Sequence, residues 1–205
     1  MKKLIPLSLL LVVCGTSLFA KTTLAKNAPA QHKPAKTNPA VAHQTNSQIL
    51  GFTLDFQEKR ILDVADAMPE EKYDFAPSSE GFRGVRTFRE QLRHIAADNY
   101  MLGSAILREK APVELGAGES GNTAANTKAE IIRDLKASFA YMHRAAATTD
   151  DGNVPIPTPS ISPWPGGTAT RLGVAIEDLV HTWDHYGQLV EYLRMNNIVP
   201  PASRK

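Results

Sequence analysis

The sequence has a single cysteine, Cys14, among 205 residues. Cys14 lies in an apolar stretch near the N-terminus, so a chain that has lost this stretch contains no thiol and no disulfide. A cysteine nucleophile and a cysteine-ligated metal site are therefore excluded for such a chain. The sequence also lacks a glycine-rich phosphate-binding loop, an internal repeat and the alternating apolar pattern of a half-buried strand.

Acidic residues are absent from residues 1–47, which contain six lysines. The overall net charge of +2 is therefore misleading, because residues 48–205 hold 17 of the 23 basic residues and all 21 acidic ones, a net charge of −4. A mildly acidic globular part argues against nucleic acid as a partner.

The first 20 residues have the pattern of a secretory signal peptide. Two lysines precede the apolar run LIPLSLLLVV, which is too short to span a bilayer. Cleavage after Ala20 and cleavage after Ala25 both fit the small residues found there. Val13 stands where a lipobox has Gly, Ala or Ser, so lipid attachment at Cys14 is the less favoured alternative. We expect a periplasmic or secreted protein with no stable membrane insertion after the signal is removed.

Residues 21–47 are rich in Ala, Pro, Lys, Asn and Thr and nearly lack large apolar side chains. Such a segment cannot bury enough surface to offset its chain entropy, so we predict a disordered linker. The globular domain then spans residues 48–203.

Helical periodicity occurs in four segments of this domain. The segments are 48–68, 87–108, 127–147 and 171–196, and the second and third open with Thr-x-x-Glu capping boxes. Two long connections, 110–126 and 148–170, separate the last three segments. The pattern predicts an all-α fold, a four-helix bundle with two long inter-helix loops.

The fourth predicted helix carries His181 and His185, which lie one turn apart on one face. Thr182 stands where the zincin motif has Glu, so that class of metalloprotease is excluded. A third histidine, His94, lies early in the second predicted helix, with Asp98 one turn later. Facing helices of a bundle can supply ligands to a buried site, and three neutral imidazoles leave one position of a metal ion open to water.

Spacing alone leaves two interpretations of the three histidines open, a metal site and a polar patch on the bundle. Imidazole binds Zn, Ni and Fe, so the divalent metal ion is not identified. Asp98 is the candidate catalytic residue, as a general base, or an acceptor that orients His94. A solvated carboxylate is the alternative for Asp98.

An apolar seam runs along the fourth predicted helix on the face away from the histidines. Its members are Leu172, Ile176, Leu179, Trp183, Tyr186, Val190 and Leu193. We expect both faces to be buried, either by the other helices or by a second copy of the chain. Because symmetric pairing is the commonest way to cover such a surface, we predict a homodimer.

Three segments carry a resemblance to a known family. They are PEEKYDFAP (69–77), EQLRHIAADNYMLGSAI (90–106) and HTWDHYGQLVEYLRMNNIVPPAS (181–203). The chain resembles the DinB family, also called DinB/YfiT-like metalloenzymes, over residues 48–203. The resemblance implies a four-helix bundle in which His94 joins His181 and His185 on a divalent metal ion.

The better-understood members of that family are thiol-dependent transferases and isomerases. An exported protein meets little reduced thiol, which weakens the expectation of thiol transfer. The resemblance therefore implies a metal-dependent hydrolase or transferase that acts on a small-molecule substrate. The alternative is a non-catalytic metal-binding or stress-response module whose metal site is structural or vestigial.

Overall fold

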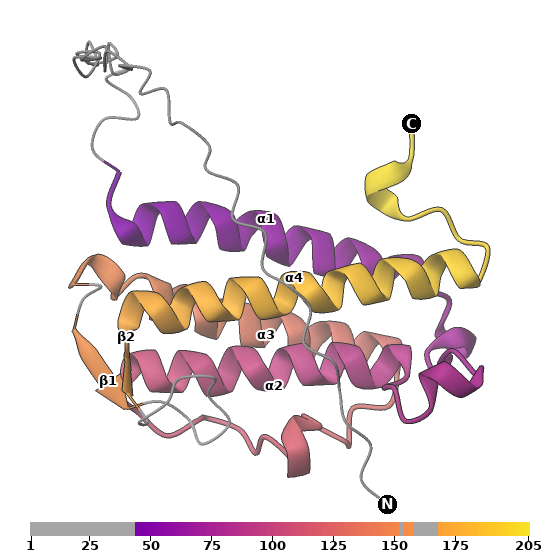
Figure 1. The fold of residues 1–205 in the computed structure, drawn as a ribbon, viewed down its shortest axis with the longest axis horizontal. Coiled ribbons are helices and arrows are strands. Elements are labelled where there is room, and N and C mark those ends of the chain that lie inside the picture. The colour runs from indigo at the N-terminus through magenta and orange to yellow at the C-terminus, as the bar shows by residue number, and fades with distance from the viewer. Residues whose placement is uncertain (1–43, 152–153, 158–167) are drawn as a thin grey trace, which may run out of the picture. The chain divides into compact units, whose positions relative to one another are not determined.

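Threonine side chains cap the starts of four long helices in the computed structural model of the protein (Figure 1). The helices are α1 (Asn46–Ala67), α2 (Phe88–Leu107), α3 (Lys128–Ala146) and α4 (Arg171–Met195). Thr45, Thr87 and Thr127 form capping boxes, and Thr170 Oγ1 accepts a hydrogen bond from the backbone N–H of Gly173. A capping side chain satisfies a backbone N–H that has no partner inside the helix. The first helix thus begins two residues before the predicted position 48, because Thr45 caps it.

The structure describes residues 44–151, 154–157 and 168–205, which lie in one compact unit, Pro39–Lys205. The predicted signal peptide, and the predicted linker up to residue 43, lie outside the described residues. The prediction of disorder is wrong at Asn46 and Ser47, which are the first residues of α1. The predicted all-α four-helix bundle is confirmed. No helix in the described part of the chain is long and apolar enough to cross a membrane.

The order of the helices around the bundle explains why the connection between α2 and α3 is long. α1 packs against α3 and α4, and α2 also packs against α3 and α4. α1 and α4 run in one direction and α2 and α3 in the other (Figure 1). Since α2 and α3 are parallel neighbours, the chain between them must return along the bundle. This return segment, residues 108–127, contains the short 3₁₀ helix η3 (Ala117–Glu119). The other 3₁₀ helices are η1 (Glu70–Lys72), η2 (Glu80–Phe82), η4 (Thr149–Asp151) and η5 (Pro201–Ser203).

Buried polar side chains separate two apolar clusters inside the bundle. One cluster includes Ile61, Phe88, Leu92, Phe139 and Leu193, and the other includes Leu50, Leu54, Ile106, Met142 and Val174. The polar side chains between them come from all four helices: Gln57, Asp98, Asn99, Ser138, Asp178, Thr182 and His185. Polar groups are expensive to bury, so a polar layer at mid-height of the bundle points to a functional role.

Two three-residue strands correct the expectation that the chain contains no strand. β1 (Pro155–Pro157) pairs antiparallel with β2 (Thr168–Thr170), and Ile156 lies opposite Ala169. Strands this short cannot show alternation, and proline is tolerated in strands that have a free edge. The pair ends directly at the start of α4, where Arg171 Nε donates a hydrogen bond to Ile106 O at 3.2 Å.

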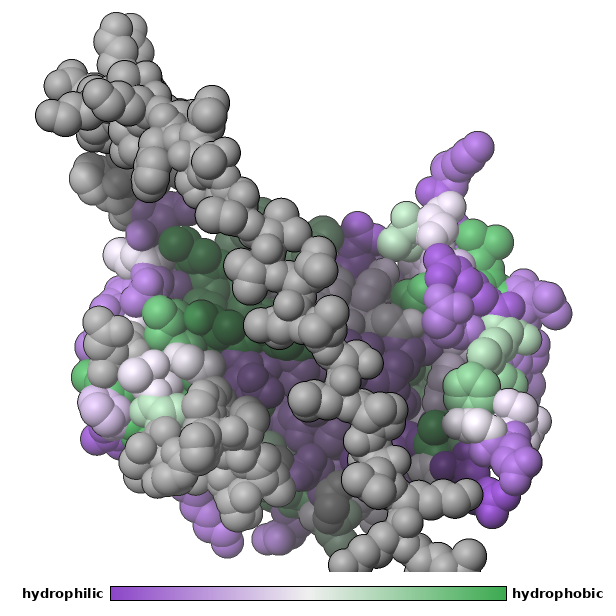
Figure 2. Space-filling view, viewed as in Figure 1, coloured by the Kyte–Doolittle hydropathy of each residue, from purple (hydrophilic) through white to green (hydrophobic). Residues whose placement is uncertain are grey.

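Several large apolar side chains of α1 and α4 face solvent. They are Ile49, Phe52 and Phe56 on α1 and Ile176 and Val180 on α4, each between 47% and 75% exposed. Figure 2 shows hydrophobic surface over the beginnings of these two helices. The prediction that α4 buries both of its faces is therefore wrong at Ile176, whereas Leu193 of the same seam is fully buried.

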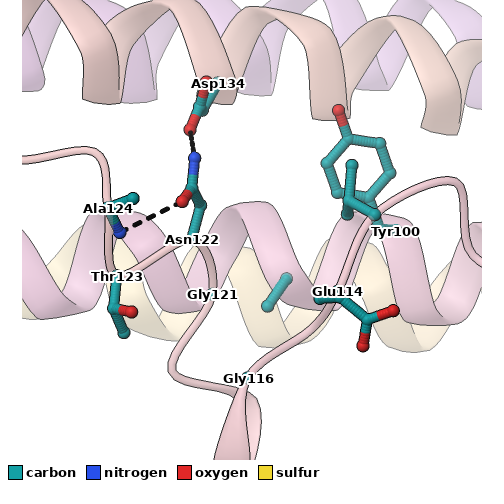
Figure 3. Close-up of a pocket in the computed structure, with 10 residues that line it drawn as sticks. Tyr100, Glu114, Gly116, Gly121, Asn122, Thr123, Ala124 and Asp134 are labelled. Atoms are coloured by element: carbon teal, nitrogen blue, oxygen red, sulfur yellow. Dashed lines mark hydrogen bonds between the residues drawn. The ribbon is translucent and has the colours of Figure 1, made fainter.

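A hollow of about 320 Å³ lies between α2, α3 and the return segment (Figure 3). Tyr100 of α2 and Asp134 of α3 line it, and Asn122 Nδ2 donates a hydrogen bond to Asp134 at 2.7 Å. None of the predicted site residues lines this hollow.

Candidate metal centre

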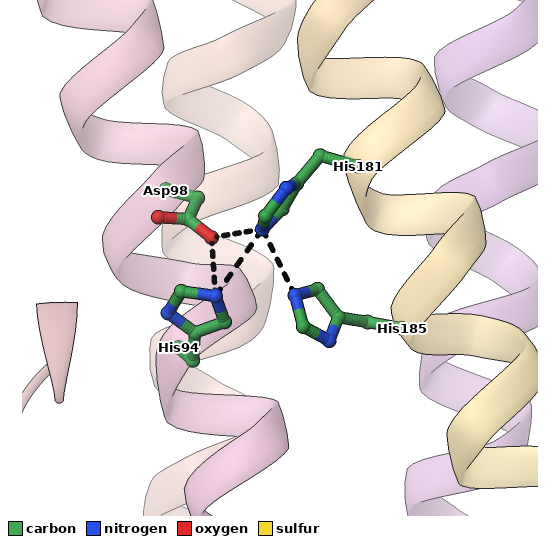
Figure 4. A group of neighbouring side chains, drawn as sticks. All are labelled: His94, Asp98, His181 and His185. Atoms are coloured by element: carbon green, nitrogen blue, oxygen red, sulfur yellow. Dashed lines mark hydrogen bonds and ion pairs between the residues drawn. The ribbon is translucent and has the colours of Figure 1, made fainter. Parts of the chain in front are cut away.

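Four side chains from α2 and α4 converge in the polar layer of the bundle (Figure 4). His94 and Asp98 lie one turn apart on α2, and His181 and His185 lie one turn apart on α4. One ligand atom from each residue lies within 4.8 Å of those of the other three. The structure therefore brings together all four site residues predicted from the sequence.

His181 Nε2 lies at the centre of the group. It is 3.2 Å from His94 Nε2, 2.9 Å from His185 Nε2 and 2.9 Å from Asp98 Oδ2. Asp98 Oδ2 is also 3.0 Å from His94 Nε2. Ligand atoms about 2.0–2.1 Å from a tetrahedral zinc ion lie roughly 3.4 Å apart, so the observed separations are close to those of a ligand set. Asp98 is thus placed to be a fourth ligand as well as a general base.

Hydrogen bonds alone cannot account for all of the close contacts in this group, because the four side chains carry too few protons between these atoms. His94 Nδ1 lies 3.1 Å from the carbonyl oxygen of Glu119, which assigns the ring proton of neutral His94 to Nδ1 and leaves Nε2 a bare acceptor. A proton on His181 Nε2 can bridge to only one of its three close neighbours. The remaining contacts would set lone pair against lone pair. A cation between the four atoms removes this repulsion, so the residues present fit a divalent metal ion.

Burial and neighbouring charges favour neutral imidazoles at two of the three histidines. Burial, followed by the charges of His181 and His94, lowers the pKa of His185 to about 3. Burial also lowers the pKa of His94. The hydrogen bond with Asp98 raises the pKa of His181, whose side chain keeps 37% of its surface exposed. The centre therefore reaches solvent at His181, and a metal ion must displace a proton mainly there.

The return segment contributes a contact that the sequence did not reveal. Glu119 accepts the hydrogen bond of His94 Nδ1 through its backbone oxygen, and its carboxylate oxygen Oε2 lies 3.7 Å from the same nitrogen. Glu119 has a left-handed φ of 58°, and Gly121 has one of 68°. A Cβ atom at Gly121 would collide with the carbonyl oxygen of Arg93 on α2. The sequence predicted a long connection at 110–126, but nothing in it showed that this segment packs on α2 and orients His94.

Asp178 is a second buried residue that the sequence analysis did not select. It lies on α4 one turn before His181, is fully buried, and has no hydrogen-bond partner for either carboxylate oxygen among the described residues. Burial and then the charge of Asp98 raise its pKa to about 7. Thr182 Oγ1 is also buried without a partner in the described part of the chain. The sequence did contain a signal for Asp178. It stands three residues before His181 and seven before His185, which places it on the same inward face of the helix.

Comparison with known proteins supports the assignment of the fold. A model of the DinB superfamily matches residues 53–189, well over half of the chain. The match begins in α1 and includes α2, α3 and the part of α4 that carries His181 and His185. No curated protein matches the chain.

Proposed function

The chain belongs to the DinB superfamily, and on this premise we propose that it is an exported metal-binding protein that hydrolyses a small molecule or transfers a group to or from it. The observation that carries the proposal is the convergence of three histidine Nε2 atoms and one Asp98 oxygen, within 4.8 Å of one another, inside the bundle. Imidazole nitrogens and a carboxylate oxygen are ligands that divalent transition metals accept. The resemblance of the sequence to known members of the family supports the same ligands.

Each residue of the centre has a role in this proposal. His94, His181 and His185 would hold the metal ion, and the carbonyl oxygen of Glu119 keeps the His94 proton on Nδ1. A divalent ion held there would lower the pKa of a bound water towards neutrality and polarise a substrate oxygen. Asp98 would accept a proton from the nucleophile, and a substrate would reach the centre on the exposed side of His181.

A second candidate function follows from the position of Asp98. Its Oδ2 atom lies as close to His181 Nε2 as a metal ligand would, and four protein ligands complete a tetrahedral zinc ion. A site closed in this way is structural, and the protein would be a non-catalytic metal-binding or stress-response module. Nickel or ferrous iron accept more than four ligands and would keep positions open in the same ligand set.

Cobalt(II) substitution separates these two functions. The visible spectrum of the Co(II) protein is recorded with and without azide, a small anion that binds at an open position. The catalytic proposal expects azide to change the spectrum of the parent protein. A spectrum that azide leaves unchanged in the parent and changes only in Asp98→Asn would mean that Asp98 closes the site, and the structural alternative would hold.

Export is the part of the proposal that rests on residues 1–20 alone. The chain recovered from its native cells is expected in the periplasm or the medium, with a mass that corresponds to a start at Lys21 or Lys26. A chain found in the cytoplasm with Met1 still attached would remove export from the proposal.

A further inference from the structure

Two glutamines bridge α2 and α4 beside the metal centre. Gln91 stands three residues before His94 on α2, and Gln188 stands three residues after His185 on α4. Gln91 Nε2 donates a hydrogen bond to Gln188 Oε1 at 2.6 Å, and Gln188 Nε2 donates one to Asp184 Oδ2 at 2.8 Å. This glutamine pair therefore lies about one helical turn from the histidines, towards the start of α2.

Two buried polar atoms of the glutamine pair and the metal centre have no hydrogen-bond partner among the described residues. They are Gln91 Oε1 and His185 Nδ1, and the residues that carry them are only 3% and 5% exposed. Buried polar groups are normally satisfied by the protein, by ordered water or by a ligand. Both atoms therefore indicate that a polar molecule lies next to the metal centre.

The hydroxyl of Tyr192 holds the backbone of Arg86 on α4, beyond the glutamine pair. Tyr192 Oη donates a hydrogen bond to the Arg86 carbonyl oxygen at 2.9 Å. Tyr192 stands seven residues after His185, which puts it on the same face of α4 and about 10.5 Å further along the axis. Side chains of a helix lean towards its N-terminus, so the ring of Tyr192 leans back towards His185. Arg86 is thereby placed where its long side chain can extend to the metal centre.

The guanidinium of Arg86 faces the metal centre. Burial is the main cause of the low pKa of His94 and of His185, and the charge of Arg86 lowers both further. Because this effect weakens with distance, the charge must lie near both histidines, one on α2 and one on α4. Arg86 is also half-buried, whereas Arg83 of the same connection leaves 80% of its side chain exposed.

We propose that Arg86 binds an anionic group of the substrate, a carboxylate or a phosphate, while the metal centre holds the end of the substrate that reacts. This inference rests on the proposed function. The guanidinium fork matches two oxygens of such a group and makes charge-assisted hydrogen bonds to it. Binding at both ends fixes the orientation of the substrate. The unpartnered oxygen of Gln91 lies between the two ends and can accept a hydrogen bond from a hydroxyl or amide there.

Hydroxamates test the proposal in the full chain loaded with Co(II), because the hydroxamate binds the metal ion and leaves its tail to reach towards Arg86. Butanohydroxamate has an uncharged tail, and the monohydroxamate of succinate has the same carbon chain ending in a carboxylate. A hydroxamate with a phosphonate tail of the same length separates phosphate from carboxylate recognition. Dissociation constants are measured by calorimetry for the parent, for Arg86→Gln and for Arg83→Gln, the matched control. Metal content and helix content are measured for each protein.

The parent and Arg83→Gln are expected to bind a hydroxamate with an anionic tail at least about tenfold more tightly than butanohydroxamate, the usual effect of a hydrogen bond to a charged group. Preference for one anionic tail over the other identifies the group and supports the proposal. In Arg86→Gln the advantage of the anionic tail should fall below about twofold, with metal content, helix content and the affinity for butanohydroxamate unchanged. If Arg86→Gln does not fold, Arg86→Lys replaces it, which keeps the charge without the fork and should lose at least about threefold of the advantage.

Two results would overturn this inference alone. One is a parent that binds metal and butanohydroxamate but gains nothing from either anionic tail, and the other is an Arg86→Gln variant that keeps the full advantage. A parent that binds neither metal nor butanohydroxamate would overturn the proposed function, and this inference with it.

Discussion

Asp178→Asn tests the cost of burying a carboxylate beside the metal centre. Asp178 is fully buried and its pKa of about 7 lies about 3 units above the ordinary value for aspartate. Each unit corresponds to about 1.4 kcal/mol, so keeping this group ionised costs the folded, metal-free protein up to about 4 kcal/mol. A pKa that is higher in the folded state means that the folded state binds more protons. Stability then falls as the pH rises through about 4 to 7.

Asparagine has the same shape and stays neutral, so it avoids this cost. Asp178→Asn is expected to leave the free energy of unfolding nearly unchanged at pH 4 and to raise it by about 2–4 kcal/mol at pH 8. Urea unfolding with a chelator present, repeated from pH 4 to pH 8, measures the difference. Asp184→Asn, an exposed position on the same helix, is the control and should stay within about 0.5 kcal/mol throughout. A loss of stability at pH 8, or a gain that does not vary with pH, would refute the reasoning.

Three further predictions concern the N-terminal segment, the return segment and pH. Removing residues 1–41 should not change the unfolding temperature, because the capping residue Thr45 and its contacts are retained; a loss of several degrees in differential scanning calorimetry would contradict this. Gly121→Ala should weaken metal binding about 10- to 100-fold in competition titrations, because the added Cβ pushes the return segment away from α2 and His94. Gly51→Ala, where a Cβ meets nothing within 4 Å, is its control and should bind metal like the parent. Metal affinity should fall as the pH drops from 8 to 5, because histidine binds metal only when neutral. The hydrogen bond with Asp98 raises the pKa of His181, so the fall should begin above the ordinary histidine pKa of about 6.5. Equal affinities at pH 5 and pH 8 would contradict this.

Local sequence signals were sufficient for the helices. Thr-x-x-Glu boxes and apolar periodicity placed the starts of α2 and α3 correctly, whereas the start of α1 was predicted two residues too late. These signals act within a few residues, so they can be recognised in the sequence without knowledge of the tertiary structure. The convergence of His94 with His181 and His185 is a long-range contact. It was predicted because the positions of these histidines on the second and fourth predicted helices and the family resemblance indicated the same ligand set.

Features that depend on packing between distant segments were not predicted. Glu119 contacts His94 only because the return segment folds back onto α2, and loop conformation has no periodic signal. Ile176 was assigned to a buried seam because its spacing matches that of Leu172 and Leu193. Its exposure depends on where α1 and α3 lie, and α3 is across the bundle from α4. Periodicity identifies an apolar face and does not say what covers it.

The metal content of the purified protein tests the central claim most directly. The protein is isolated without added metal, and metal per chain is measured by plasma mass spectrometry for the parent and for His94→Ala, His181→Ala and His185→Ala. We predict one divalent ion per chain in the parent and less than a tenth of that in each variant, with helix content maintained. A parent that carries no metal and takes up none from Zn, Ni or Fe salts would contradict the account, and so would a His185→Ala variant that still holds one ion per chain.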